Sequence, residues 1–243
     1  MATEKKLHLV VIGAHIGDAE VTAGGVVCKY TRAGHRATFL HLTPGEKGNP
    51  KMDHLEYKQQ RLAETRRSAA KMGADVMVFD YADGELPVNN EAKLKVCDAV
   101  RQLKPDIVIT HWHGSFHRDH RNCHINAMEG VFWAALPGIV RELPAHCVNA
   151  LYYAENWEDP YGYKPDFWID ISEVYDQWRE ALREHALFRG EVASFNYLQY
   201  YDGLTAMRGA EVGYKRAQTF ALPPISRKRG LPFFPTDEPV LVF

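Results

Sequence analysis

Histidine and acidic residues gather in two short segments of the sequence. Five of the 12 histidines lie within residues 111–124, in the segment HWHGSFHRDHRNCH, and His15 and Asp18 follow an apolar run that ends near residue 12. Imidazole nitrogens combined with carboxylate oxygens are the ligands that Zn²⁺ and Fe²⁺ prefer, whereas Ca²⁺ and Mg²⁺ prefer oxygen alone. His117 and His120 are three residues apart, so they would share one face of a helix that begins near them. Together, the two segments predict a site for one divalent metal ion.

Each of these residues also has an ordinary structural interpretation. A single histidine after a strand usually only forms hydrogen bonds, and we expect His111, His113 and His124 to support the site or to lie on the surface. Arg61 and Glu64 are one helical turn apart and would by default form a solvated ion pair. The metal prediction therefore depends on the combination of segments and not on any one residue.

The apolar pattern predicts an α/β domain. Leu7 to Ile12 is a continuous apolar run, which is typical of a strand buried on both faces of a parallel sheet, and Gly34 and Gly73 stand where helices usually end. The expected strands are residues 7–12, 37–42, 76–79, 107–110, 151–154 and 167–171. The expected helices are residues 18–33, 53–72, 94–103, 122–135 and 174–188. This alternation favours a mostly parallel sheet with helices on both faces.

Polar segments follow each of the first four expected strands. They are residues 14–20, 43–48, 80–85 and 111–120. Ligands of an open parallel sheet collect outside the carboxyl ends of its strands. We therefore expect all four segments to meet at one edge of the sheet.

The composition is that of an ordinary globular protein, and we expect one domain over residues 1–243. A net charge of -2 gives no electrostatic reason to approach nucleic acid or anionic lipid, so we expect a small-molecule substrate and neither a nucleic-acid nor a membrane partner. The four cysteines form no CxxC pair, and the first apolar stretch is too short for a signal peptide, so the cytoplasm is the expected compartment. Residues from about 190 to 243 are expected to form an irregular extension, packed on the domain or against another subunit of a homo-oligomer.

The sequence resembles the LmbE-like (PIG-L) family of metal-dependent N-deacetylases over essentially its whole length. The A-H-P-D-D-x-E motif of that family stands here as AHIGDAE at residues 14–20, and its H-P-D-H motif as HRDH at residues 117–120. Residues 42–46 (LTPGE), 61–64 (RLAE) and 216–220 (RAQTF) look like its L-T-x-G-E loop, its R-x-x-E helix and its closing Y-A-E-A-F segment. A later helix keeps His185 of the family pattern but has Leu187 and Phe188 where the family has Ser-Gln.

The resemblance implies a Rossmann-like fold in which Zn²⁺, or alternatively Fe²⁺, is held by His15, Asp18 and His120. In the chemistry of the family, the metal polarises an N-acetyl carbonyl and activates water. The histidine that stabilises the resulting oxyanion corresponds to His117, and Asp119 would orient it.

The same resemblance indicates residues that would bind the substrate. Arg61 and Glu64 match the R-x-x-E helix, and Glu20 closes the first motif. We expect these three residues to contact a small polar substrate, namely an N-acetylated amino sugar or its conjugate.

One departure from the family pattern removes a catalytic group. The aspartate that takes a proton from water in the family falls at Gly17, which has no side chain. General-base catalysis contributes about 10² to 10⁴ in rate, so the chain would be a slow enzyme, an enzyme with a relocated base, or a binding protein. Asp119 and Glu46 are the candidate replacements for the base.

Three functions are compatible with these motifs. The leading hypothesis is a zinc-dependent deacetylase that hydrolyses a linear amide, the N-acetyl bond of an amino sugar. An amidase that acts on a thiol-sugar conjugate would use the same metal and differ only at the rim of the pocket. A carbohydrate-binding or sensory protein that has lost its base would bind sugar without releasing amine.

Overall fold

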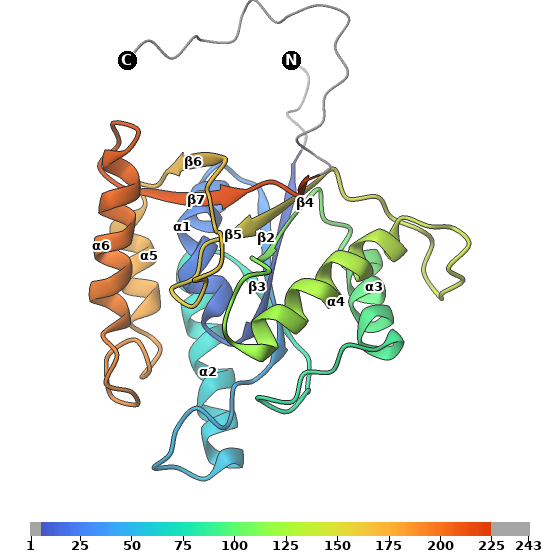
Figure 1. The fold of residues 1–243 in the computed structure, drawn as a ribbon, viewed down its shortest axis with the longest axis horizontal. Coiled ribbons are helices and arrows are strands. Elements are labelled where there is room, and N and C mark those ends of the chain that lie inside the picture. Colours follow the sequence, from blue (N-terminus) through green and yellow to red (C-terminus); the bar gives the residue numbers. More distant parts are fainter. Residues whose placement is uncertain (1–5, 225–243) are drawn as a thin grey trace, which may run out of the picture.

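The computed structural model describes residues 6–224, which form a seven-stranded sheet between layers of helices (Figure 1). The strands are β1 (His8–His15), β2 (Arg36–Thr43), β3 (Asp75–Val78), β4 (Ile107–His111), β5 (Ala150–Ala154), β6 (Phe167–Asp170) and β7 (Ala217–Ala221). The helices are α1 (Asp18–Arg32), α2 (His54–Met72), α3 (Asn90–Leu103), α4 (Arg118–Ala134), α5 (Tyr175–Leu182) and α6 (Tyr197–Ala210).

The sheet has the strand order β3-β2-β1-β4-β5-β7-β6. The first five strands in this order pair in parallel, whereas β7 pairs antiparallel with both β5 and β6. The predicted α/β fold with a mostly parallel sheet is therefore confirmed. None of the helices in the described part of the chain is both long and apolar enough to cross a membrane.

Side chains of β1 alternate between two hydrophobic cores. Leu9 and Val11 lie in one core with residues of α1, α2 and α5, and Val10 and Ile12 lie in the other with residues of α3 and α4. Figure 1 shows the green helices α3 and α4 on the side of the sheet opposite to the blue helix α1. Because both faces of the strand are buried, its sequence is continuously apolar instead of alternating.

Helix termini explain where the structure departs from the expected boundaries. Helix α4 begins four residues earlier than expected, because the side chain of His117 caps it by accepting a hydrogen bond from the backbone N–H of Asp119. Helix α5 is shorter than the expected helix 174–188, because the chain turns tightly after Leu182, whose carbonyl accepts the N–H of His185. The early start of α4 places His120 in the first turn of the helix.

The expectation of an irregular extension from residue 190 onward is wrong for residues 197–221. This segment forms α6 and β7, and all five residues of β7 are buried. The side chain of Gln218 holds this strand to α1 by accepting the backbone N–H of Val26. Residues 225–243 lie outside the described residues, and the homo-oligomer and the cytoplasmic location stay predictions.

Gly24 lets α1 pack closely against its neighbours, and its replacement should destabilise the fold. A Cβ atom at this position would lie 2.7 Å from Trp178 Cδ1 and 2.9 Å from Met72 Sδ. Overpacking of a core costs about 1–3 kcal/mol, which exceeds the gain of about 0.5–1 kcal/mol from replacing a helical glycine by alanine. We therefore expect Gly24→Ala to lower the free energy of unfolding, measured by urea denaturation.

Gly203 provides a matched control for this variant. It also lies within a helix, α6, but a Cβ atom there would meet no heavy atom within 4 Å. Gly203→Ala should therefore raise the free energy of unfolding slightly. Equal effects of the two substitutions would contradict the close packing of α1.

Candidate active site

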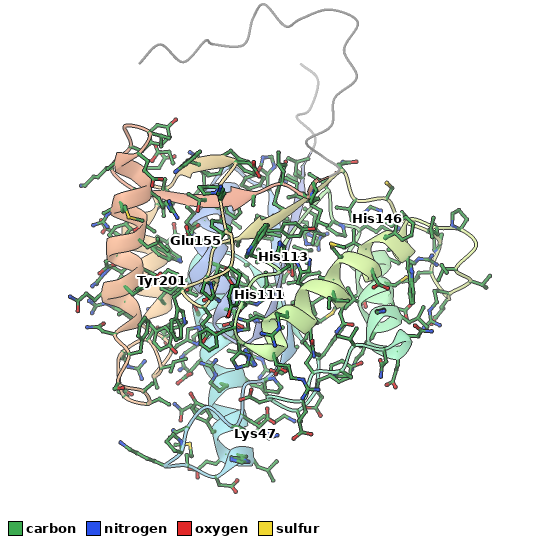
Figure 2. The ribbon with its side chains drawn as sticks, viewed as in Figure 1. Lys47, His111, His113, His146, Glu155 and Tyr201 are labelled. Carbon is green, nitrogen blue, oxygen red and sulfur yellow. The ribbon has the colours of Figure 1, made fainter. Side chains whose placement is uncertain are left out.

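The four loops that follow β1, β2, β3 and β4 converge on one cavity of about 190 Å³, as the sequence predicts. The residues of these loops that line it are His15, Ile16, Gly17, Asp18, Gly45, Gly48, Asp83, His117 and His120. Figure 2 shows His111 beside the strand ends and Tyr201 on the side of α6 that faces the sheet. Tyr201 belongs to the opposite wall of the same cavity.

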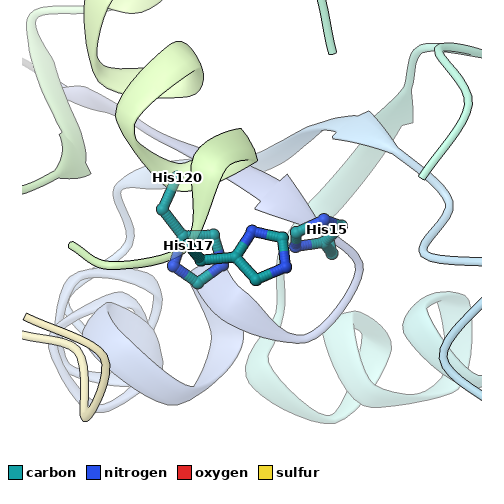
Figure 3. A group of neighbouring side chains, drawn as sticks. All are labelled: His15, His117 and His120. Carbon is teal, nitrogen blue, oxygen red and sulfur yellow. The ribbon is translucent and has the colours of Figure 1, made fainter. Parts of the chain in front are cut away.

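The carboxylate of Asp18 lies between two histidines from different loops. Its Oδ2 atom is 3.1 Å from Nδ1 of His15 and 3.1 Å from Nε2 of His120. Figure 3 shows His117 and His120 at the start of α4 next to His15 at the end of β1. Around a tetrahedral zinc ion, ligand atoms about 2.0–2.2 Å from the metal lie roughly 3.3–3.5 Å apart. The two measured distances are slightly shorter than this range, and the donor types fit a divalent metal. The described residues contain three groups whose ligand atoms lie within 4.8 Å of one another, namely His15, His117 and His120; Asp18, His111 and His120; and His15, Asp83 and Asp119.

His111 lies next to this group but has a structural task. Its ring stacks on that of His120 with centroids 4.2 Å apart, and Asp18, His111 and His120 offer ligand atoms within 4.8 Å of one another. However, Nε2 of His111 accepts the backbone N–H of Ala14 at 3.0 Å, so its lone pair is already engaged. This contact fits the expectation that His111 supports the site.

His15 is surrounded by carboxylates. Nε2 of His15 lies 3.1 Å from Asp83 and 3.2 Å from Asp119, while Nδ1 faces Asp18. Burial alone lowers the pKa of His15, but Asp119, Asp18 and Asp83 together raise it well above its ordinary value. Positive charge is thus favoured here, and a carboxylate on the outer nitrogen is the usual support of a metal-ligating histidine.

His120 is neutral in its buried position. Burial lowers its pKa to about 3, although the charge of Asp18 opposes this shift. Its Nδ1 atom lies 3.3 Å from Oγ of Ser115 and 3.1 Å from a carboxylate oxygen of Glu158. Burial, assisted by the charge of Asp18, raises the pKa of Glu158 to about 7. A neutral imidazole keeps the lone pair that a metal ion requires.

His117 lines the cavity with a defined tautomer. Its Nδ1 atom accepts the backbone N–H of Asp119 at 3.2 Å, so its proton resides on Nε2 in the neutral ring. Burial and the nearby charge of His15 lower the pKa of His117, which favours this neutral form. The expectation that the carboxylate of Asp119 orients His117 is wrong, because that carboxylate contacts His15 and accepts the N–H groups of Gly84 and Leu86.

Glu46, Glu20 and Glu64 do not belong to the residues that line the cavity. Glu46 accepts the backbone N–H of Asp83 and so holds the loop after β3. Glu20 is buried and accepts the backbone N–H of Gly17. Of the three residues expected to contact substrate, the structure places only Arg61 in the lining, because the other two carboxylates are used within the protein.

Contacts within the protein direct the carboxylate of Glu64 away from the cavity. Glu64 is 1% exposed, and its Oε1 atom accepts hydrogen bonds from Gln60 at 2.7 Å and from the backbone N–H of Ala186 at 3.2 Å. Its Oε2 atom lies 3.8 Å from Nδ1 of His185. Glu64 thereby joins α2 to the segment that follows α5.

Gly17 and Phe188, two departures from the family pattern, lie against each other. Gly17 has a φ angle of 101°, which residues with a side chain rarely adopt. A Cβ atom built on Gly17 would lie 3.0 Å from Cζ of Phe188 and 3.5 Å from Nη2 of Arg61. A side chain at position 17 would therefore crowd the phenyl ring.

The outer wall of the cavity is rich in aromatic side chains, and its residues come from segments after β5. They are Trp157, Phe188, Tyr197 and Tyr201, together with Leu187, Ala193, Asn156 and Glu158. The ring of Trp157 stacks on Phe195 with centroids 4.4 Å apart. None of these residues was predicted to line the cavity, because no local motif marks them and packing between distant segments brings them there. Asp83 was not predicted either, although the loop that carries it was expected at this edge.

Comparisons with known proteins agree with this arrangement. A diacetylchitobiose deacetylase from Thermococcus kodakarensis is 29% identical over 190 residues, which cover 73% of this chain and 68% of the relative. A 4-oxalmesaconate hydratase from Pseudomonas putida is 24% identical over 225 residues, which cover 87% of this chain and 83% of the relative. The structure of N,N'-diacetylchitobiose deacetylase from Pyrococcus horikoshii has the same fold, with a TM-score of 0.79 at 22% identity, over 93% of this chain and 87% of that chain.

The family model PIG-L, described as GlcNAc-PI de-N-acetylase, matches residues 10–131. This region is half of the chain and contains His15, Asp18, His117 and His120. The chain therefore belongs to the PIG-L (GlcNAc-PI de-N-acetylase) family.

Proposed function

We propose that this protein is a metal-dependent hydrolase that cleaves the N-acetyl amide of an amino sugar or of its conjugate. The observation that carries the proposal is the position of Asp18 in the cavity, with one oxygen 3.1 Å from a nitrogen of His15 and 3.1 Å from a nitrogen of His120. The substrate class is supported by the relative named diacetylchitobiose deacetylase.

In this proposal, His15, Asp18 and His120 hold the metal, with Zn²⁺ as the expected ion and Fe²⁺ as the alternative. A divalent ion at this position would supply Lewis-acid polarisation of the amide carbonyl and would lower the pKa of a water molecule. Asp119 keeps His15 oriented through its outer nitrogen, and Glu158 lies in the same relation to His120.

The remaining steps fall to residues of the chain. His117 carries its proton on Nε2, so it can donate a hydrogen bond to the carbonyl oxygen as negative charge develops there. Gly17 cannot accept a proton from water, and Asp119 and Glu46 are engaged elsewhere. We assign proton transfer to Glu158, because its carboxylate lines the cavity beside His120 and burial raises its pKa to about 7, close to the value that suits a general base.

A second candidate is the addition of water to the double bond of an unsaturated acid. The glycine at position 17 favours this second candidate. The aspartate that the family has there takes the water proton in amide hydrolysis, and its loss need not affect a different reaction at the same metal. The relative named 4-oxalmesaconate hydratase, similar over 87% of this chain, supports it as well. In this reaction the oxygen of water bonds to one carbon and a proton is delivered to the other.

Product analysis tests the two candidates directly. Metal-loaded protein should release free amine from a panel of acetamido sugars and their conjugates, and His117→Ala should lower the turnover about 10²- to 10³-fold while the metal stays bound. The hydratase predicts instead loss of ultraviolet absorbance from unsaturated dicarboxylic acids with no amine. Binding of sugars without any turnover would favour the binding protein, and unchanged turnover in His117→Ala would exclude the proposed role of this residue.

Elemental analysis of purified variants tests the metal ligands. We expect one divalent metal per chain in the wild type and little metal in His15→Ala or His120→Ala, because each loses one of three ligands. His113→Ala is the matched control, since His113 belongs to the same histidine cluster but is exposed. Full metal content in both ligand variants would show that other residues bind the ion.

Restoring a carboxylate at position 17 should not by itself restore a base. We expect Gly17→Asp to lower the free energy of unfolding by about 1–3 kcal/mol, because the φ angle of 101° is strained for a side chain and the Phe188 ring is in the way. Gly34→Asp, with φ of 85° and no atom within 4 Å of its Cβ position, measures the backbone cost alone.

The combination of Gly17→Asp with Phe188→Gln then isolates the contact between the two positions. Phe188→Gln alone loses core packing and serves as the reference, because Phe188 is buried. Relative to it, Gly17→Asp should cost no more than the Gly34 control. Urea denaturation and metal content are the measurements. A single variant as stable as wild type would contradict the coupling of residues 17 and 188.

A further inference from the structure

Arg61 is a buried cation beside the cavity. Its side chain is 3% exposed, and it lines the cavity on the side of Gly17 and Gly45. Its Nη2 atom contacts the carbonyl oxygen of Ile16, whereas Nε and Nη1 have no hydrogen-bond partner in residues 6–224. A buried guanidinium without an anionic partner is energetically unfavourable.

The carboxylates that could neutralise Arg61 from the same helix or the same cavity contact other groups. Glu64, one turn further along α2, accepts hydrogen bonds at Oε1 and directs Oε2 toward His185. Asp83, in the same cavity, contacts His15 and accepts the backbone N–H of Lys47. Within the described part of the chain, no carboxylate forms an ion pair with Arg61.

The surroundings of Arg61 would strengthen its attraction for an anion. Gly17 contributes no charge, and the ring of Phe188 occupies the space beside it. The Tyr57 ring lies 5.8 Å from the guanidinium carbon. Because these neighbours exclude water, a charge pair formed here is screened less than one at the surface.

Arg61 also lies close to the proposed metal ligands. A Cβ atom built on Gly45 would be 3.6 Å from Nη2 of Arg61 and 3.3 Å from Cβ of His15. A single glycine therefore separates the guanidinium from His15. One small molecule can reach both groups at the same time.

We propose that Arg61 binds a carboxylate group of the substrate, so that the molecules on which this cavity acts are acidic. The inference rests on the proposed function to the extent that the cavity is taken as the substrate site. A planar guanidinium matches the two oxygens of a carboxylate, and the substrate would supply the negative charge that the protein does not.

Calorimetry with small carboxylates tests this inference independently of turnover. Metal-free protein is titrated with glutaramate, which has one carboxylate, and with neutral glutaramide of the same shape. We expect glutaramate to bind at least about tenfold more tightly, because the guanidinium of Arg61 can pair with its carboxylate. The Arg61 variants below separate this attraction from that of His15, which lines the same cavity. Metal-loaded protein should in addition bind glutarate more tightly than glutaramate, because the second carboxylate of glutarate can reach the metal.

Substitutions in α2 test whether Arg61 causes the preference for glutaramate over glutaramide. Arg61→Gln keeps a donor for Ile16 but removes the charge, so the ratio of the two dissociation constants should fall to near one. Arg61→Lys should retain part of the preference for glutaramate. Arg66→Met, a control at an exposed position of α2, should retain all of that preference. Circular dichroism and metal content verify that each variant is folded.

The outcomes separate this inference from the proposed function. A preference for carboxylate that depends on Arg61, in protein that releases no amine from any acetamido compound, supports the acidic substrate and rejects the amide reaction. Amine release together with equal affinity for glutaramate and glutaramide overturns the inference and leaves the reaction intact. An unchanged preference in Arg61→Gln also overturns it.

Discussion

The carboxylate of Asp18 joins two loops that belong to different parts of the sequence. One oxygen accepts the backbone N–H of His15 and lies against the side chains of His15 and His120. The loops can meet there because β1 and β4 are neighbours in the sheet. A buried carboxylate is costly unless it is paired, so the arrangement of the cavity depends on this contact being kept. Burial raises the pKa of Asp18, but its contacts with His120, His111 and His15 lower it to well below the ordinary value.

The first turn of α1 presents its two acidic residues to different environments. Asp18 faces the cavity, whereas Glu20 points into the protein and accepts the N–H of Gly17 and the hydroxyl of Thr65. Glu20 thereby fixes the loop from behind while Asp18 orders the histidines in front. Burial raises the pKa of Glu20, but His41 and other neighbours lower it to about 2, so the carboxylate that holds the loop is charged.

Patterns that are local in sequence were sufficient to predict the sheet and the half of the site that carries His15, Asp18 and His120. The apolar run of β1 and the polar loops after four parallel strands predict where His15, Asp18 and His120 meet, because topology alone brings those loops together. The direction of a side chain was not predictable in this way, which is why Glu20 was wrongly expected to face the substrate. Glu158, Trp157 and Phe188 come from irregular segments, and Tyr197 and Tyr201 from α6, and their positions are set by packing between distant parts of the chain.

Strand β7 lies between β5 and β6 although it follows both of them in the chain. Among the strands of residues 6–224, the edge strand β6 pairs with β7 alone, so its partner is absent until residues 217–221 have been synthesised. The histidine-bearing loops, in contrast, are complete once residue 120 has been made. As a chain emerges from its amino end, the charged half of the cavity can form first and the aromatic half last. The two halves of the cavity thus come from successive parts of the chain, the histidines from residues up to 120 and the aromatic side chains from residues 157–201.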